Sequence, residues 1–206
     1  MFRSVLVAAA IAVASVGSPV LAQTVSSEAI VNQLQPKPAA TRGLTRSLGA
    51  PAPAAPAVSP EDKAFLRSLS PTRGLQQVER EKVAEIVAKQ ELPKIDIQIT
   101  FDYDSDHIRA SSIPDVNELG KALLSAQLSG ARLLLNGHTD AAGSAEYNQA
   151  LSERRAQAIR AYLTGTFGIG PERLIAIGYG KEQLKNKADP LADENRRVEV
   201  VNLVQN

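Results

Sequence analysis

Residues 133–163 read LLLNGHTDAAGSAEYNQALSERRAQAIRAYL, and they combine an apolar run, a polar loop and a long amphipathic segment. The run ARLLLNG is typical of a buried strand. Ser144 is of the residue type that caps a helix N-terminus, and the apolar positions after it recur with the helical period to about Phe167. The stretch therefore predicts a strand, a tight loop and a long helix in succession.

One basic side chain, that of Arg155, falls on the apolar side of this predicted helix. At about 100° per residue, Arg155 lies roughly 40° from Leu151 and inside the apolar arc that also holds Ile159. A guanidinium cannot become neutral by losing a proton, so on a half-buried face it needs an anionic partner. That partner is either an internal carboxylate, for which Asp140 and Asp104 are the candidates, or the carboxylate of a bound ligand.

Three further segments predict the other strands, and they alternate with helices. The predicted strands are KIDIQITFDY at 94–103, RLIAIGYG at 173–180 and RRVEVVNLV at 196–204. A further helix is predicted from Pro114 to a stop at Gly130. This alternation indicates an α/β fold, an α+β sandwich whose sheet is covered by helices, over residues 93–206.

The N-terminal residues 1–22 have the three parts of a cleavable export signal: a positive start, an apolar run and a small-residue end. We expect cleavage after Ala22. The alternative is an uncleaved membrane anchor. It is disfavoured because Gly17 and Pro19 interrupt the run before it reaches the roughly 20 apolar residues that span a bilayer.

Two segments separate this signal from the predicted domain. Residues 23–60 are rich in Ala, Pro, Ser and Thr, and they have too few large apolar residues to offset the entropy of ordering. We expect a disordered linker, in which a helix over 27–33 would be marginal. Residues 61–92 predict a helical lead-in, with Ser59 as its N-cap and Pro60 at its first position.

Composition and spacing argue against several function classes. The 206 residues carry a net charge of +1, which gives no signature of nucleic-acid binding, and they contain no cysteine for a disulfide, a thiolate metal site or a nucleophile. His138 and Asp140 could suggest a metal, but zinc needs three or four ligands and His107 is the only other histidine. GIGPERLIAIGYG fails the dinucleotide fingerprint, because Arg173 stands where the last glycine belongs.

The helix sequence resembles the OmpA-like peptidoglycan-binding domain family, whose pattern is Asn-x-x-Leu-Ser-x-x-Arg-Ala-x-x-Val-x-x-x-Leu. GIGPERLIAIGYG and NRRVEV follow in the family's order, so the resemblance extends from about Ile95 to Leu203. It implies a roughly four-stranded mixed sheet covered by helices. It also implies non-covalent binding of peptidoglycan, without catalysis or a cofactor, in the periplasm and in association with the outer membrane. The residues that carry the pattern, with Ile in place of Val, are Asn148, Leu151, Ser152, Arg155, Ala156, Ile159 and Leu163.

The resemblance also implies a site. In this family the Asp of HTD and the Arg of the helix grip meso-diaminopimelate in the peptide stem, and the matching residues here are Asp140 and Arg155. The segment KEQLKNKADPLADENRR departs from the family, since it lacks the usual proline after GYG and the usual Gly-Arg. The supporting ligand contacts that the resemblance implies are Asp104, Ser105, Thr139, Asn148 and Arg196.

Two other functions remain open. A peptidoglycan hydrolase could use Asp104 and Asp140 as the two carboxylates that flank a sugar bond. Alternatively, the tail could act as an adaptor for an envelope protein partner, because an Arg-small-Leu pattern recurs in it. The bland explanation of that recurrence is a compositionally biased linker. The copies are TRGL at 41–44 and 72–75, TRSL at 45–48 and LRSL at 66–69.

Overall fold

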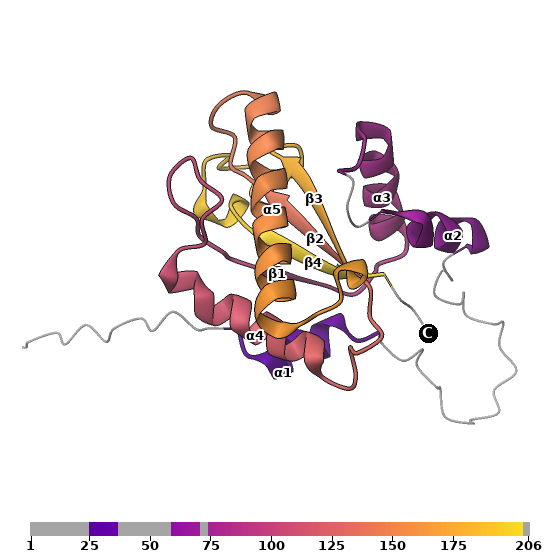
Figure 1. Cartoon of the computed structure of the whole chain (residues 1–206). Helices are drawn as coiled ribbons and strands as arrows, with labels where there is room; N and C mark the ends of the chain where they lie inside the picture. The colour runs from indigo at the N-terminus through magenta and orange to yellow at the C-terminus, as the bar shows by residue number, and fades with distance from the viewer. Residues whose placement is uncertain (1–24, 37–58, 71–73, 204–206) are drawn as a thin grey trace, which may run out of the picture.

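A computed structural model describes residues 25–36, 59–70 and 74–203, and these residues form one mixed sheet with helices on both faces (Figure 1). The strand order is β1-β4-β2-β3. Strand β4 is antiparallel to both its neighbours, whereas β2 and β3 are parallel. The predicted α/β fold with a four-stranded mixed sheet is therefore confirmed. The strands are β1 Lys94–Ile97, β2 Leu133–His138, β3 Leu174–Gly180 and β4 Val198–Asn202.

The long helix α5, Ala145–Phe167, connects β2 to β3 and packs closely on both. The Ser144 hydroxyl accepts a hydrogen bond from the Tyr147 N–H at 3.1 Å, which confirms the predicted N-cap. Glycine at position 137 permits the close approach, because a Cβ there would lie 2.4 Å from the Ser152 carbonyl oxygen. The position of α5 against the sheet is thus fixed near its first three turns.

Helix α4, Ile113–Leu124, covers the same face of the sheet as α5. Its predicted stop at Gly130 is wrong by six residues. The chain leaves the helix at Ser125, whose backbone is extended, and the turn that follows buries Leu128 in the core.

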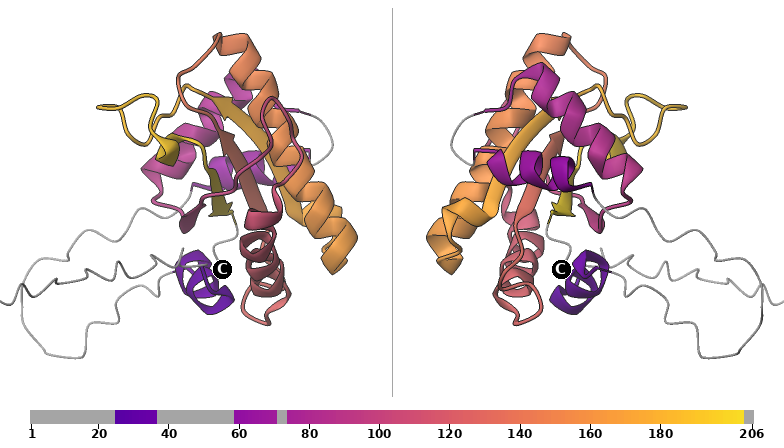
Figure 2. Two further views of the ribbon diagram at one scale, coloured as in Figure 1. Left: turned by 90° about the vertical axis from the view of Figure 1, so that its left-hand side faces the viewer. Right: turned by 90° about the vertical axis from the view of Figure 1, so that its right-hand side faces the viewer.

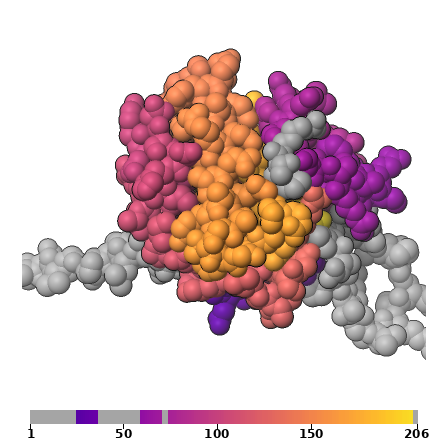
Figure 3. Space-filling model, in the orientation of Figure 1, coloured from indigo at the N-terminus to yellow at the C-terminus, as the bar shows by residue number. Residues whose placement is uncertain are grey.

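Strand β1 is also shorter than predicted, because the ladder ends at Ile97 and the chain continues as a loop. An isolated bridge between Phe101 and Ile108 closes that loop on itself. In the space-filling view of Figure 3, this loop flanks α5 on one side, and α2 and α3 lie on the other.

Two helices cover the opposite face of the sheet, α2 at Pro60–Ser68 and α3 at Gln77–Lys89 (Figure 2). The Ser59 hydroxyl accepts from the Asp62 N–H at 3.0 Å, as the predicted N-cap requires. The region predicted as a helical lead-in is thus part of the folded core. The residues in this second core cluster include Leu66, Val83, Ile86, Leu134, Ile175, Ile177 and Val201.

The guanidinium of Arg132 holds the end of α2 against the sheet. It donates to the carbonyls of Leu66 at 3.0 Å and Arg67 at 2.8 Å, and also to that of Leu69. Carbonyls of a last helical turn have no partner within the helix, so a cation there both satisfies them and complements the helix dipole.

Helix α1, Ser27–Leu34, contradicts the predicted disordered linker over 23–60. Ile30 and Leu34 are fully buried in the main core, where α1 packs on α4 and β1. Both ends are tied by hydrogen bonds: Ser27 N–H donates to Glu118 at 2.9 Å, and the Asn202 amide donates to the Leu34 carbonyl at 2.9 Å. The helix is too short to be stable alone, so tertiary packing supplies its stability.

Two copies of the Arg-small-Leu pattern, at 41–44 and 45–48, lie outside the described residues, as does the predicted export signal. The copy at 66–69 places both of its leucines in the core beneath α2. Leu75, the last residue of the fourth copy, is buried in the same cluster. These three leucines serve packing within the folded unit.

Candidate ligand-binding site

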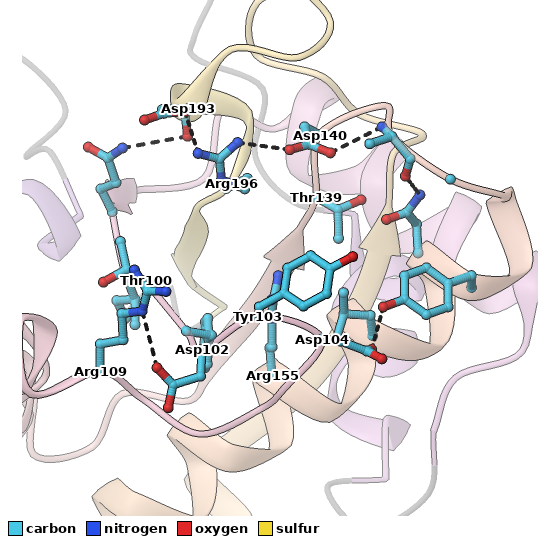
Figure 4. Close-up of a pocket in the computed structure, with 18 residues that line it drawn as sticks. Thr100, Asp102, Tyr103, Asp104, Arg109, Thr139, Asp140, Arg155, Asp193 and Arg196 are labelled. Atoms are coloured by element: carbon cyan, nitrogen blue, oxygen red, sulfur yellow. Dashed lines mark hydrogen bonds and ion pairs between the residues drawn. The ribbon is translucent and has the colours of Figure 1, made fainter.

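A pocket of about 470 Å³, here called the Asp140 pocket, lies between the loop after β1, the loop between β2 and α5, the first turns of α5, and the residues before β4 (Figure 4). Four carboxylates and three guanidinium groups line it, a formal balance of −1. The charged lining residues are Asp102, Asp104, Arg109, Asp140, Arg155, Asp193 and Arg196.

The loop that follows β2 holds the carboxylate of Asp140 at the pocket wall. One oxygen, Oδ1, accepts from the Ala142 N–H at 3.1 Å, and Oδ2 accepts from Arg196 Nη1 at 2.8 Å. The turn closes at Gly143, whose φ of 84° is a left-handed conformation that glycine adopts without strain. The two hydrogen bonds leave part of the carboxylate's acceptor capacity unused, since two oxygens offer about four lone-pair sites.

Arg155 lines the same pocket but forms no ion pair with any carboxylate of the described residues. Its Nε donates to the Ser105 carbonyl at 3.0 Å, and its guanidinium carbon lies 4.9 Å from the ring centre of Phe101. Burial lowers the pKa of Arg155, while the nearby negative charge of Asp140 acts in the opposite direction. Within the described chain, both terminal nitrogens of this guanidinium lack a hydrogen-bond partner.

Neither internal ion pair that the sequence allowed for Arg155 is present. Asp140 pairs with Arg196 instead, and Asp104 accepts a hydrogen bond from the Tyr147 hydroxyl. The structure therefore leaves Arg155 half-buried and open to an external anion.

Arg196 differs from Arg155 because both of its terminal nitrogens are in use. Nη1 donates to Asp140, and Nη2 donates to Asp193. The hydrogen bond with Asp140 is the main reason why the pKa of Arg196 is raised. Arg196 is thus positioned to hold Asp140 rather than to offer a free fork.

The loop that departs from the family pattern, between Lys181 and Glu194, is organised by the buried side chain of Asn195. Its amide donates to the carbonyls of Asn186 at 3.2 Å, Asp189 at 3.0 Å and Pro190 at 3.1 Å. The Pro190 carbonyl in turn accepts from the Ala141 N–H at 3.0 Å. The unusual loop therefore supports the backbone beside Asp140.

The other predicted site residues divide into lining and supporting ones. Thr139 lines the pocket, and its buried hydroxyl has no hydrogen-bond partner among the described residues. Asn148 also lines it, but its amide holds the Asp140 loop by donating to the carbonyls of Ala142 at 2.6 Å and Ser144 at 2.9 Å. Ser105 does not line the pocket, and its carbonyl fixes Arg155.

Several residues that line the Asp140 pocket were not predicted from the sequence. Tyr147 is 42% exposed and forms part of the pocket wall. Its position four residues before Leu151 and eight before Arg155 puts it on the same helix face, which is the signal that could have found it. The lining residues that were not predicted include Asp102, Tyr103, Arg109, Tyr147 and Asp193.

His138 and Asp140, the pair that might have suggested a metal, point to different places. His138 is buried and stacks on Tyr179, with ring centres 5.6 Å apart, whereas Asp140 faces the pocket. Burial, with a contribution from Arg197, lowers the pKa of His138 to about 3. Within the described ranges, no group of three or more His, Cys, Asp or Glu side chains could hold a metal ion.

Residues 100–197 match the model of the OmpA family. They form an OmpA-family domain. Every residue that lines the Asp140 pocket except Gln98 and Ile99 lies within the matched range. The helices α1, α2 and α3, which complete the core, lie before it.

Known proteins similar to this chain share the OmpA-family domain rather than their whole length. Outer membrane porin F of Pseudomonas aeruginosa is 34% identical over 125 residues, which cover 57% of this chain and 32% of that protein. The peptidoglycan-associated lipoprotein of the same organism is 38% identical over 102 residues, which cover 48% of this chain and 58% of that protein. The chain thus spans less than two thirds of either relative.

Among solved structures, the peptidoglycan-associated lipoprotein of Burkholderia pseudomallei matches with a TM-score of 0.43 and 29% sequence identity, covering 50% of this chain and 87% of that one. Among the described residues, no helix combines the length and the apolar character that crossing a membrane requires.

Proposed function

We propose that the OmpA-family domain binds peptidoglycan non-covalently, by gripping the free end of meso-diaminopimelate in the peptide stem. The observation that carries this proposal is the state of Arg155. Its guanidinium is half-buried and held by Nε alone, and it lines the pocket that Asp140 also lines. A half-buried cation without an internal anion is a favourable place for a ligand carboxylate.

The chemistry of the ligand matches the two charged groups. The free end of diaminopimelate carries an ammonium and a carboxylate on one carbon. The terminal nitrogens of Arg155 can donate to that carboxylate as a fork, while Asp140 accepts from the ammonium. Each charge-assisted hydrogen bond contributes about 1.5–3 kcal/mol. The unpartnered hydroxyl of Thr139 supplies a further polar contact in the same pocket.

The names of similar proteins support the same function at a coarser level. One relative is named a peptidoglycan-associated lipoprotein and another an outer membrane porin. We infer a location in the periplasm beside the outer membrane, where binding would tether the envelope to the wall. In this proposal the domain binds and does not catalyse.

Binding to isolated cell-wall sacculi tests the two-charge grip. Sacculi with diaminopimelate should retain the protein, whereas sacculi with lysine at that stem position should retain far less. Lysine lacks the terminal carboxylate, so Arg155 would remain unpaired. Equal retention by the two kinds of sacculi would overturn the proposal in favour of a contact with the glycan.

A further inference from the structure

Arg109 is a second guanidinium of the Asp140 pocket that is held by one edge only. Its Nε donates to Asp102 Oδ1 at 3.2 Å, and its terminal nitrogens have no hydrogen-bond partner within the described chain. The other oxygen of Asp102 lies 3.0 Å from Nδ1 of His107. Of the three arginines that line the pocket, Arg109 and Arg155 thus present a free fork, and Arg196 does not.

The backbone around Arg109 is fixed by its own hydrogen bonds. The Arg109 N–H donates to the Thr100 carbonyl at 3.0 Å, and the Asp102 N–H donates to the His107 carbonyl at 3.1 Å. The bridge between Phe101 and Ile108 closes the same loop. The guanidinium therefore projects from a loop with a defined shape.

Arg109 and Asp140 lie on different sides of the pocket. In Figure 4, Arg109 and Asp102 form one group, Asp140 and Thr139 lie across the pocket, and Arg155 is seen between them. The volume of about 470 Å³ falls in the range of about 300–1,000 Å³ that holds whole small molecules. One amino-acid head group at Arg155 leaves room for the next group of the same ligand.

We propose that Arg109 binds a second free carboxylate of the same peptide stem, adjacent to diaminopimelate. This inference rests on the proposed function. A stem of the form L-Ala-γ-D-Glu-meso-diaminopimelate-D-Ala has two such carboxylates, one on D-Glu and one at the C-terminus. Both have the chemistry that a guanidinium fork recognises. Asp102 is the positioning residue, because it fixes the Nε edge of Arg109 and leaves the two terminal nitrogens for the ligand.

Calorimetric titration with this soluble tetrapeptide stem, at constant salt, tests the proposal. The ligands are the unmodified stem, the stem amidated on D-Glu and the stem amidated at its C-terminus. The proteins are the wild type and Arg109→Gln. Losing a charge-assisted hydrogen bond should weaken binding of the unmodified stem about tenfold or more.

The pattern across the ligands decides the result. One of the two amidations should weaken binding to the wild type by the same factor as Arg109→Gln, and should have no further effect on the variant. That amidation identifies the carboxylate. If Arg109→Gln weakens none of the ligands, or weakens all three equally, the proposal is wrong.

Two variants separate a specific fork from simple charge. Arg109→Lys keeps the charge but lacks the two parallel N–H donors, so it should bind the unmodified stem about as weakly as Arg109→Gln does. Binding as tight as that of the wild type would contradict recognition by the guanidinium fork. Arg154→Gln makes the same change in net charge at an exposed position of α5 outside the pocket, and it should bind as the wild type does.

Failure of the proposed function gives a different result from failure at Arg109. If the wild type does not prefer the diaminopimelate stem over the same stem with lysine, the grip by Asp140 and Arg155 is wrong. If it does prefer diaminopimelate and Arg109→Gln changes nothing, only the second contact is wrong.

Discussion

The arginines that line the Asp140 pocket differ in how many hydrogen-bond donors remain free for a ligand. Both terminal nitrogens of Arg196 donate hydrogen bonds, one to Asp140 and one to Asp193. Arg196 therefore acts on ligand binding only by positioning Asp140. In Arg155, Nε donates to the Ser105 carbonyl, and the two terminal nitrogens are left for a ligand. The same residue type, three times in one pocket, therefore has different roles according to which nitrogens are occupied.

Asp140→Ala and Arg155→Ala should each abolish binding to sacculi while leaving the domain folded. Arg155→Ala removes one hydrogen bond and the contact with Phe101, which we expect to lower the free energy of unfolding by about 1–2 kcal/mol. Asp140→Ala should have a smaller effect, because Arg196 keeps Asp193 as its partner. A thermal melt and a sacculus pull-down on the same samples measure both effects.

Arg154→Ala is the control for these variants, since Arg154 is exposed on the same helix. Retained binding in Asp140→Ala and Arg155→Ala would contradict the grip. So would a loss of stability of about 3–5 kcal/mol, which is typical of breaking a buried ion pair.

At the scale of elements, the three helices before the OmpA-family match complete the fold. Helices α2 and α3 cover the sheet face that bears Leu134, Ile175 and Val201, and Arg132 holds the end of α2 there. Helix α1 packs on α4 and β1 in the core of the other face. The folded unit is therefore larger than the matched residues 100–197.

Substitution of Leu34 tests whether α1 belongs to the core. Leu34→Ala should lower the free energy of unfolding by about 2–5 kcal/mol, because it removes a fully buried side chain from the main cluster. Val78→Ala is the matched control on α3, where the side chain is 74% exposed, and it should change stability by less than about 0.5 kcal/mol. Chemical denaturation of both variants gives the comparison. If Leu34→Ala were as stable as the wild type, α1 would not be docked in solution.

At the scale of the whole molecule, stability should depend on pH through His138. Its pKa is about 3 in the folded state and about 6.5 in an unfolded chain, so the unfolded state binds the proton first as the pH falls. The free energy of unfolding should be level above pH 7. It should then fall by up to about 1.4 kcal/mol per pH unit below about pH 6.5.

Denaturation between pH 7.5 and pH 5 measures this effect, because the ordinary pKa values of carboxylates lie below that range. The hydrogen bond from Lys121 holds the pKa of Glu118 below its ordinary value. His138→Phe, which keeps an aromatic ring beside Tyr179, should flatten the profile in this range. An unchanged slope in that variant would show that other groups are responsible.

Local signals in the sequence predicted much of this molecule. The caps at Ser59 and Ser144 and the inward position of Arg155 follow from neighbouring residues, and they are confirmed. The docking of α1 could not be predicted locally, because its partner Asn202 is 168 positions away from Leu34. The pairing of Asp140 with Arg196 was missed for the same reason, since it depends on a loop that the buried Asn195 folds.

The place of β4 in the sheet has a consequence for how the chain reaches its fold. Among the described residues, β4 is the last element in the sequence, yet it lies between β1 and β2 and joins them. A chain that emerges from its N-terminus cannot close this sheet until β4 has appeared. The hydrogen bond between the Asn202 amide and the Leu34 carbonyl at the end of α1 also cannot form before then, because Asn202 belongs to β4. The sheet therefore forms late, because the strand that joins β1 to β2 follows every other element of the described residues in the sequence.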